Sequence, residues 1–303
     1  MDFAVWPAFD RSWEETLALA QFAERNGYRS FWYADHMMPD RPDGTPDPGD
    51  AYDCWTILAA IGAVVPRVRL VSMVSPLTIH HPAVLAKRAT TTDHISGGRA
   101  VLGIGAGWQV NEHACYGFDL LDVGPRVARF AEGIEIIHRL LRDESTTFAG
   151  KSFTLTDAPF SPKPVQSPLP ILVGTKGARM QRLTARFAQE WNTWGAPDLA
   201  ASRLADLLAA CAAEGRELST LRLSAQAMVL LTDSQAELDA FGDFAKAPNV
   251  IAGSAAFLQE QMTRYQELGF DEFAVPDFTL GDSAAARADK LAQIHETVVK
   301  PLM

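Results

Sequence analysis

Residues 69–103, RLVSMVSPLTIHHPAVLAKRATTTDHISGGRAVLG, hold one helical segment between two short apolar runs. The runs at residues 69–74 and 100–103 have the length and apolar character of buried strands. Residues 82–95 between them are long enough for a helix, and Pro82 suits its first turn. A strand, a helix and a second strand at this spacing predict two parallel strands joined by a helical crossover.

The same alternation continues toward both ends of the chain. The expected strands are residues 3–6, 30–33, 69–74, 100–103, 170–174, 190–193, 223–231 and 272–276. The expected helices are residues 12–26, 52–65, 82–95, 125–141, 178–188, 199–214, segments around Gln235 and Ala255, and residues 284–299. Eight strands, each followed by a helix, predict an α/β fold of the closed (β/α)₈ TIM-barrel type rather than an open doubly wound sheet. We expect this barrel to form one domain over residues 1–303.

Two segments interrupt the repeat and are expected to be insertions after strands. Residues 39–50 are rich in Pro, Asp and Gly, and residues 145–168 are irregular and contain four prolines. Loops that leave the C-terminal ends of barrel strands build the active site of such folds. Residues 39–50, which follow the second strand, are therefore a candidate lid.

Composition excludes several classes of partner. The chain has 27 Lys and Arg against 37 Asp and Glu, a formal charge of -10, and its basic residues do not cluster, so nucleic acid is not an expected partner. Its beginning lacks the features of an export signal, and no apolar run approaches the roughly 18 residues that suggest a membrane span. We therefore expect a cytoplasmic protein with no membrane partner. Cys54, Cys115 and Cys211 are isolated, which predicts neither disulfides nor a thiolate metal site.

Polar residues gather where the expected strands end. The second strand runs into Tyr33-Ala34-Asp35-His36, which places an acid and an imidazole at the mouth of the expected barrel. His36 is suited to exchange a proton near neutral pH, although a purely structural Asp35–His36 pair explains the same pattern.

The third strand ends in small hydroxyl residues, including Ser72, which let a planar ring approach the backbone. The alternative is an ordinary loop with two solvent-facing histidines, His80 and His81. Adjacent histidines point apart and no acidic residue lies in helical register with them, so no metal site is expected.

The fourth strand runs into a glycine-rich segment, Gly103-Ile104-Gly105-Ala106-Gly107-Trp108. It is a weak match to a dinucleotide fingerprint, because the last glycine is out of register and no helix is expected to start directly there. A glycine-lined strand end instead lets a flat cofactor pack against backbone, with Trp108 as a wall and Asn111 as a hydrogen-bond partner.

A second glycine-containing turn, Gly174-Thr175-Lys176-Gly177, precedes the helix expected from Ala178. Free backbone N–H groups, the positive end of a helix and nearby cations favour phosphate binding, whereas a plain turn is the alternative. The spacing is not that of a P-loop.

Taken together, these segments resemble the luciferase-like flavin and deazaflavin oxidoreductases, in particular the probable coenzyme F420-dependent reductases. The resemblance runs through FWYADHMMP, HHPAVLAKRATTTDHISGGRAVLGIGAGWQVNEHACYG, PKPVQSPLPILVGTKGARMQRLTARFAQEWNTWG and GFDEFAVPDF. It implies hydride transfer between F420 and a small organic substrate, and a homodimer. Two alternatives stay open: a monooxygenase that uses reduced flavin mononucleotide (FMN) and dioxygen, and a non-catalytic flavin-binding protein.

The resemblance also implies roles for individual residues. His36 would handle a proton, and Asp35 would lie near the cofactor ring. A cis peptide between Ser72 and Met73 would support the ring. The turn from Gly174 to Gly177 would receive the cofactor phosphate, and Asn111 would face the cofactor.

The chain departs from its resemblance group at two places. Trp108 stands where F420-dependent glucose-6-phosphate dehydrogenases have glutamate, which argues against a sugar phosphate as substrate. The usual Ala-Asp-Gly-Trp-Asn of the sixth strand is Ala188-Gln189-Glu190-Trp191-Asn192 here.

Overall fold

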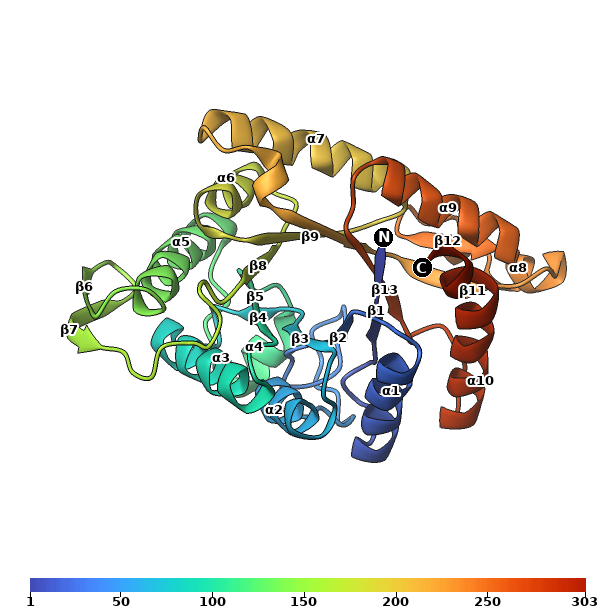
Figure 1. Ribbon diagram of the computed structural model, residues 1–303, viewed down its shortest axis with the longest axis horizontal. Coiled ribbons are helices and arrows are strands. Elements are labelled where there is room, and N and C mark those ends of the chain that lie inside the picture. The colour runs from blue at the N-terminus through green and yellow to red at the C-terminus, as the bar shows by residue number, and fades with distance from the viewer.

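Eight parallel strands close into a barrel in the computed structural model, which describes residues 1–303 (Figure 1). The barrel strands are β1 Asp2–Trp6, β2 Ser30–Tyr33, β3 Arg69–Ser72, β5 Ala100–Gly105, β8 Ile171–Gly174, β9 Glu190–Trp194, β10 Arg222–Gln226 and β13 Glu272–Pro276. They follow one another around the barrel in chain order. Parallel pairing of β1 with β13, and of β3 with β5, closes the ring. The predicted TIM barrel is confirmed.

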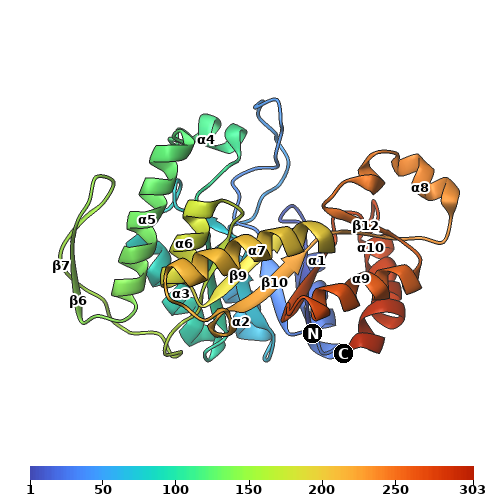
Figure 2. The same ribbon diagram turned by 90° about the horizontal axis from the view of Figure 1, so that it is seen from above.

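Helices surround the strands on the outside, as both ribbon views show (Figures 1 and 2). One outer helix accompanies each barrel strand: α1 Trp13–Arg25, α2 Cys54–Val64, α3 Pro82–Ser96, α5 Val123–Leu140, α6 Ala178–Phe187, α7 Pro197–Ala213, α9 Ala255–Glu267 and α10 Ala284–Ile294. After α10 the chain ends in a π-helical turn, His295–Val299, and a 3₁₀ turn, Lys300–Leu302. The large apolar core lies between strands and helices, and a smaller cluster that includes Trp6, Trp32 and Met73 fills the barrel interior.

Local signals in the sequence account for many helix ends. Ser12 and Asp53 accept hydrogen bonds from the backbone N–H groups of Glu15 and Thr56, which caps α1 and α2. Helix α3 starts on Pro82 and ends at Gly97, whose φ of 68° is left-handed and favours glycine. These short-range devices explain why the predicted helices lie within a few residues of the observed ones.

Charged side chains fill the N-terminal end of the barrel. Arg69, Glu190, Arg222 and Glu272 are the first residues of β3, β9, β10 and β13. Arg69 pairs with Glu190, and both Arg69 and Arg222 lie 3.7 Å from the Glu272 carboxylate. Burial raises the pKa of Glu272, although the two arginines oppose the shift. We call these four residues the ionic layer.

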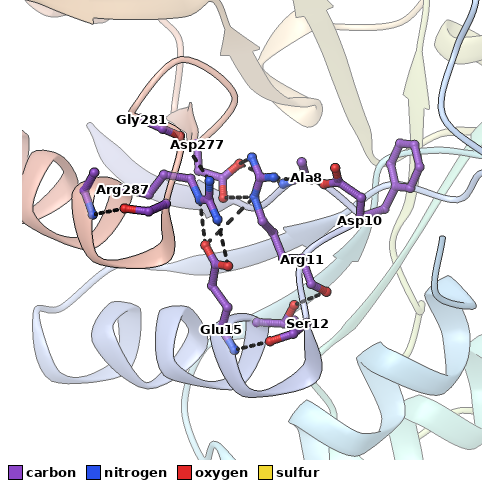
Figure 3. A network of polar contacts seen from close by, with 12 residues as sticks. Ala8, Asp10, Arg11, Ser12, Glu15, Asp277, Gly281 and Arg287 are labelled. Carbon is purple, nitrogen blue, oxygen red and sulfur yellow. Dashed lines mark hydrogen bonds and ion pairs between the residues drawn. The ribbon is translucent and has the colours of Figure 1, made fainter. Parts of the chain in front are cut away.

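A second charged network joins the first and last units of the barrel (Figure 3). Asp277, directly after β13, accepts hydrogen bonds from the Ala8 N–H at 2.8 Å and from Arg11 Nε at 3.0 Å. Glu15 on α1 accepts two bonds from Arg287 on α10, at 2.7 and 2.9 Å. Both ends of the chain are thereby held to the same side of the barrel.

The structure corrects one predicted strand. Residues 223–231 do not form one strand: β10 ends at Gln226, and β11 Met228–Leu231 leaves the barrel to pair with β12 Val250–Gly253. Periodicity did not reveal the break, because Ala227 between the two strands is itself buried and apolar. Helix α8 Gln235–Phe241 and a 3₁₀ turn, Phe244–Lys246, lie between β11 and β12.

Further elements lie in segments without a strand or helix prediction. Residues 145–168 contain an antiparallel hairpin, β6 Ser145–Ala149 with β7 Thr154–Pro159, which projects beyond α5 (Figure 2). A short strand, β4 Ser75–Pro76, pairs with the end of β5. Helix α4 Val110–Tyr116 follows the glycine-rich segment, and a 3₁₀ turn, Leu218–Thr220, follows α7.

Candidate active site

The C-terminal ends of the barrel strands, which we call the mouth, carry glycines on one side. A β-carbon on Gly103 would lie 1.8 Å from the Ser72 carbonyl oxygen, and one on Gly105 would lie 2.7 Å from Val74 Cγ2. A β-carbon on Gly174 would lie 3.3 Å from Val74 Cγ1. The half-buried Val74 thus packs against strand ends that carry no side chains, and it can come this close only because these positions are glycine.

The cis peptide bond after β3 lies one residue later than predicted. The cis peptide lies between Met73 and Val74, not between Ser72 and Met73. Ser72 is fully buried, and its hydroxyl donates to the Gly103 carbonyl and accepts from the Gly103 N–H. Met73 belongs to the barrel interior. Val74, which the sequence did not single out, is therefore the side chain at the mouth.

Asp35 is buried directly after β2 among polar partners. Ser75 donates its hydroxyl to Asp35 Oδ2 and accepts from Trp55 Nε1, and His80 Nε2 lies 3.0 Å from the same carboxylate oxygen. Burial alone would raise the pKa of Asp35, but His80 and Ser75 hold it below its ordinary value. Asp35 is therefore an anion held in place beside the mouth.

His36 is held by a glutamate that the sequence analysis did not identify. Its Nδ1 lies 3.2 Å from Glu112 Oε1, and the other oxygen of Glu112 accepts the Met37 N–H at 2.8 Å. Because a carboxylate only accepts hydrogen bonds, it favours the proton on Nδ1 and leaves Nε2 without a partner in the chain. The rings of Phe9 and Trp108 flank the imidazole, at centroid distances of 5.3 and 5.6 Å.

Helix α4 fastens the candidate lid. Asn111 donates to the carbonyl oxygens of Pro39 and Thr45, and its own oxygen accepts from Gln109 and from the Glu112 N–H. Asn111 is fully buried, so its amide is committed to the loop instead of standing free toward a cofactor as expected. The loop rises beside α4 in Figure 2. Ala106 is half-buried, and Gly107 has a φ of 89° in the segment that leads to α4.

The turn after β8 presents an uncapped helix end. Helix α6 begins at Ala178, and no side chain caps its first N–H groups. Thr175 is half-buried, and its hydroxyl lies 3.4 Å from the Gly177 nitrogen. Lys176 and Arg179 are exposed and form no ion pair, whereas Arg182 pairs with Glu214 at 2.9 Å. Only Lys176 and Arg179 are therefore available to bind an anion at this turn.

The two adjacent histidines have separate surroundings. His80 Nδ1 lies 3.3 Å from Arg88, so this ring is shared between Arg88 and Asp35. His81 accepts the Ala83 N–H and packs edge-on against Phe153.

A cavity of about 240 Å³ lies away from these residues, between α1 and α10. Its walls are mainly apolar and include Leu19, Phe22 and Leu291, while Glu15, Asp277 and Arg287 of Figure 3 are among its polar residues. None of the predicted site residues lines it. No helix in the structure combines the length and apolar character needed to span a membrane.

Comparison with known proteins places the chain in a family. The sequence profile of the luciferase-like monooxygenase family matches residues 1–241. The chain therefore belongs to this family of flavin- or F420-dependent oxidoreductases.

The individual relatives include an uncharacterized protein, an F420-dependent enzyme and a monooxygenase. An uncharacterized protein of Mycobacterium tuberculosis is 29% identical over 293 residues, which cover 91% of this chain and 92% of the relative. The F420-dependent glucose-6-phosphate dehydrogenase of Nakamurella multipartita is 34% identical over 180 residues, 59% of this chain and 51% of the relative. A monooxygenase from Streptomyces bottropensis has the same fold, with a TM-score of 0.84 at 21% identity and full coverage of both chains.

Proposed function

We propose that this protein is an oxidoreductase that transfers a hydride between coenzyme F420 and a small organic substrate. The observation that carries the proposal is His36, which buried Glu112 orients at the mouth of the barrel. The sequence similarity to an F420-dependent dehydrogenase supports this choice of cofactor, with about half of that relative matched.

The residues at the mouth fit a flat cofactor with a phosphate. Val74 provides a small apolar surface over Gly105 and Gly174, which carry no side chains, and the uncapped N-terminus of α6 suits an anion. We assign Gly174, Thr175, Lys176 and Gly177 to the phosphate, and Met73, Val74, Gly105, Ala106, Gly107 and Trp108 to the surroundings of the ring.

The chain supplies positioning and proton transfer. When bound, the deazaflavin ring supplies or accepts the hydride. His36 donates or accepts the accompanying proton at Nε2, while Glu112 fixes the orientation of the imidazole through Nδ1. The buried Asp35 anion, held by Ser75 and His80, places a fixed negative charge beside the same site.

Parallel binding titrations with oxidised F420 and FMN test this proposal. We expect F420 to bind more tightly, and substrate reduction to proceed equally well without dioxygen. Tight FMN binding with oxygen-dependent turnover would support the monooxygenase instead. Cofactor binding with no turnover across a panel of carbonyl and enone substrates would support a non-catalytic flavin-binding protein.

We also propose a homodimer. Helix α2 has no charged side chain, and Thr56, Ala63 and Val64 on its outer face are exposed. A helix that is apolar on all sides is normally covered. Sedimentation equilibrium of the wild type is expected to give twice the mass of one chain. The Ala63→Arg variant is expected to give the mass of one chain. A wild-type monomer would contradict the proposal.

A further inference from the structure

Two amide side chains, Asn192 on β9 and Gln226 on β10, point into the barrel. Their neighbours Trp191 and Ala225 pack in the core beneath the helices. Because successive residues of a strand face opposite sides, Asn192 and Gln226 face inward. They are 2% and 4% exposed.

Hydrogen bonds within the chain determine how both amides are turned. Asn192 Nδ2 donates to the Ser224 carbonyl oxygen at 3.4 Å and to Gln226 Oε1 at 2.7 Å. It also lies 3.1 Å from the Ser224 hydroxyl, which donates its own proton to the Trp191 carbonyl. A carbonyl oxygen only accepts, so the nitrogen of Asn192 must stand on this side.

The opposite end of each amide is left without a partner. No hydrogen bond from the chain reaches Asn192 Oδ1 or Gln226 Nε2. Neither atom is fully enclosed by the chain, so both remain free to bond to a group that enters the barrel. The barrel thus offers one acceptor and one donor from adjacent strands.

The amide pair adjoins the wall already assigned to the cofactor ring. Asn192 is in register with Gly174, and a β-carbon on Gly174 would approach Val74. Gln226 is in register with Trp194 on β9 and with Ala274 on β13. Asn192 therefore lies beside Gly174 and Val74, and Gln226 lies on the next strand, β10.

We propose that Asn192 and Gln226 bind the imide edge of the cofactor ring. An imide has one N–H between two carbonyl groups, and this edge is common to deazaflavins and flavins. The N–H donates to Asn192 Oδ1, and an adjacent carbonyl oxygen accepts from Gln226 Nε2. This inference rests on the proposed function for the identity of the ring, but not on the choice between F420 and FMN.

The test compares the oxidised cofactor that the wild type binds with its derivative methylated on the imide nitrogen. Dissociation constants are measured by fluorescence for the wild type, Asn192→Ala, Gln226→Met and the control Gln261→Met. Gln261 is also buried, but lies on α9 outside the barrel. Thermal unfolding of each variant shows whether it folds.

We expect methylation to weaken wild-type binding about tenfold, the size of one lost buried hydrogen bond. Asn192→Ala should abolish this discrimination, Gln226→Met should weaken binding of the parent cofactor about tenfold, and Gln261→Met should change neither. Equal wild-type affinity for parent and methylated cofactor, or unchanged binding by Gln226→Met, would overturn the inference while leaving the proposed function intact. The wild-type comparison of parent and methylated cofactor, and the comparison of Gln226→Met with the wild type, both decide the inference even if Asn192→Ala does not fold. A wild type that binds neither F420 nor FMN would overturn the proposed function and this inference together.

Discussion

The two ends of the barrel use buried polar groups in opposite ways. At the N-terminal end, the ionic layer pairs arginine with glutamate between different strands of the barrel. At the mouth, His36, Asn192 and Gln226 each bind the chain through one end and leave another polar atom without a partner. The first arrangement holds strands together. The second is suited to a ligand, and four predictions test this division.

The largest expected effect is on turnover. His36→Ala should lower the rate of the chemical step by about 10² to 10⁴, because a positioned proton-transfer group contributes about this much. Cofactor affinity should change little, since Nε2 is expected to act on the substrate. Single-turnover kinetics measure the rate of the chemical step, and a cofactor titration measures the affinity. His94→Ala, on the outer side of α3, is the control, and an equal loss in both variants would remove His36 from the mechanism.

The next effect concerns stability at the other end of the barrel. Arg69→Met should lower the free energy of unfolding by about 3 to 5 kcal/mol, because it leaves the buried Glu190 and Glu272 without this partner. Arg67→Met, which removes an exposed arginine paired with Glu24, should cost far less. Urea denaturation measures both. Similar losses in the two variants would show that the ionic layer does not hold the strands together.

The buried Asp35 anion predicts a pH effect on stability. Its pKa is lowered in the folded chain, so the unfolded chain takes up the proton at higher pH. The stabilising contribution of Asp35 is therefore complete above its ordinary pKa of about 3.9 and is lost as the pH falls toward the folded value. Wild-type stability should fall more steeply below pH 5 than that of Asp35→Asn, as measured by urea denaturation at several pH values. Asp206→Asn, on the exposed face of α7, should keep the wild-type slope. Parallel slopes for wild type and Asp35→Asn would contradict this account.

The smallest effect is expected at the phosphate turn. Lys176→Ala and Arg179→Ala should each weaken cofactor binding about two- to fivefold at low salt, because exposed charge pairs contribute little. The effect should fade at high salt, where screening is stronger. Arg182→Ala should leave binding unchanged, because this side chain already pairs with Glu214. Isothermal titration at two salt concentrations checks this, and a larger effect at Arg182 would place the phosphate elsewhere.

The sequence alone determined the order of strands and helices and where several site residues lie along them. Alternating apolar runs, prolines at helix starts and glycines at helix ends act within a few residues, so they are readable before folding. The strand-end positions of Asp35, His36 and the turn from Gly174 to Gly177 followed from this order. The family resemblance supplied their expected roles.

Tertiary structure alone decided which distant residues meet. Glu112 reaches His36 across 76 positions of the chain, and Asn192 meets Gln226 across 34, because closing the barrel brings their elements together. It also turned Asn111 toward the lid and placed the cis peptide at Met73–Val74. Such contacts depend on strand register and on the path of the loops, which local periodicity does not encode.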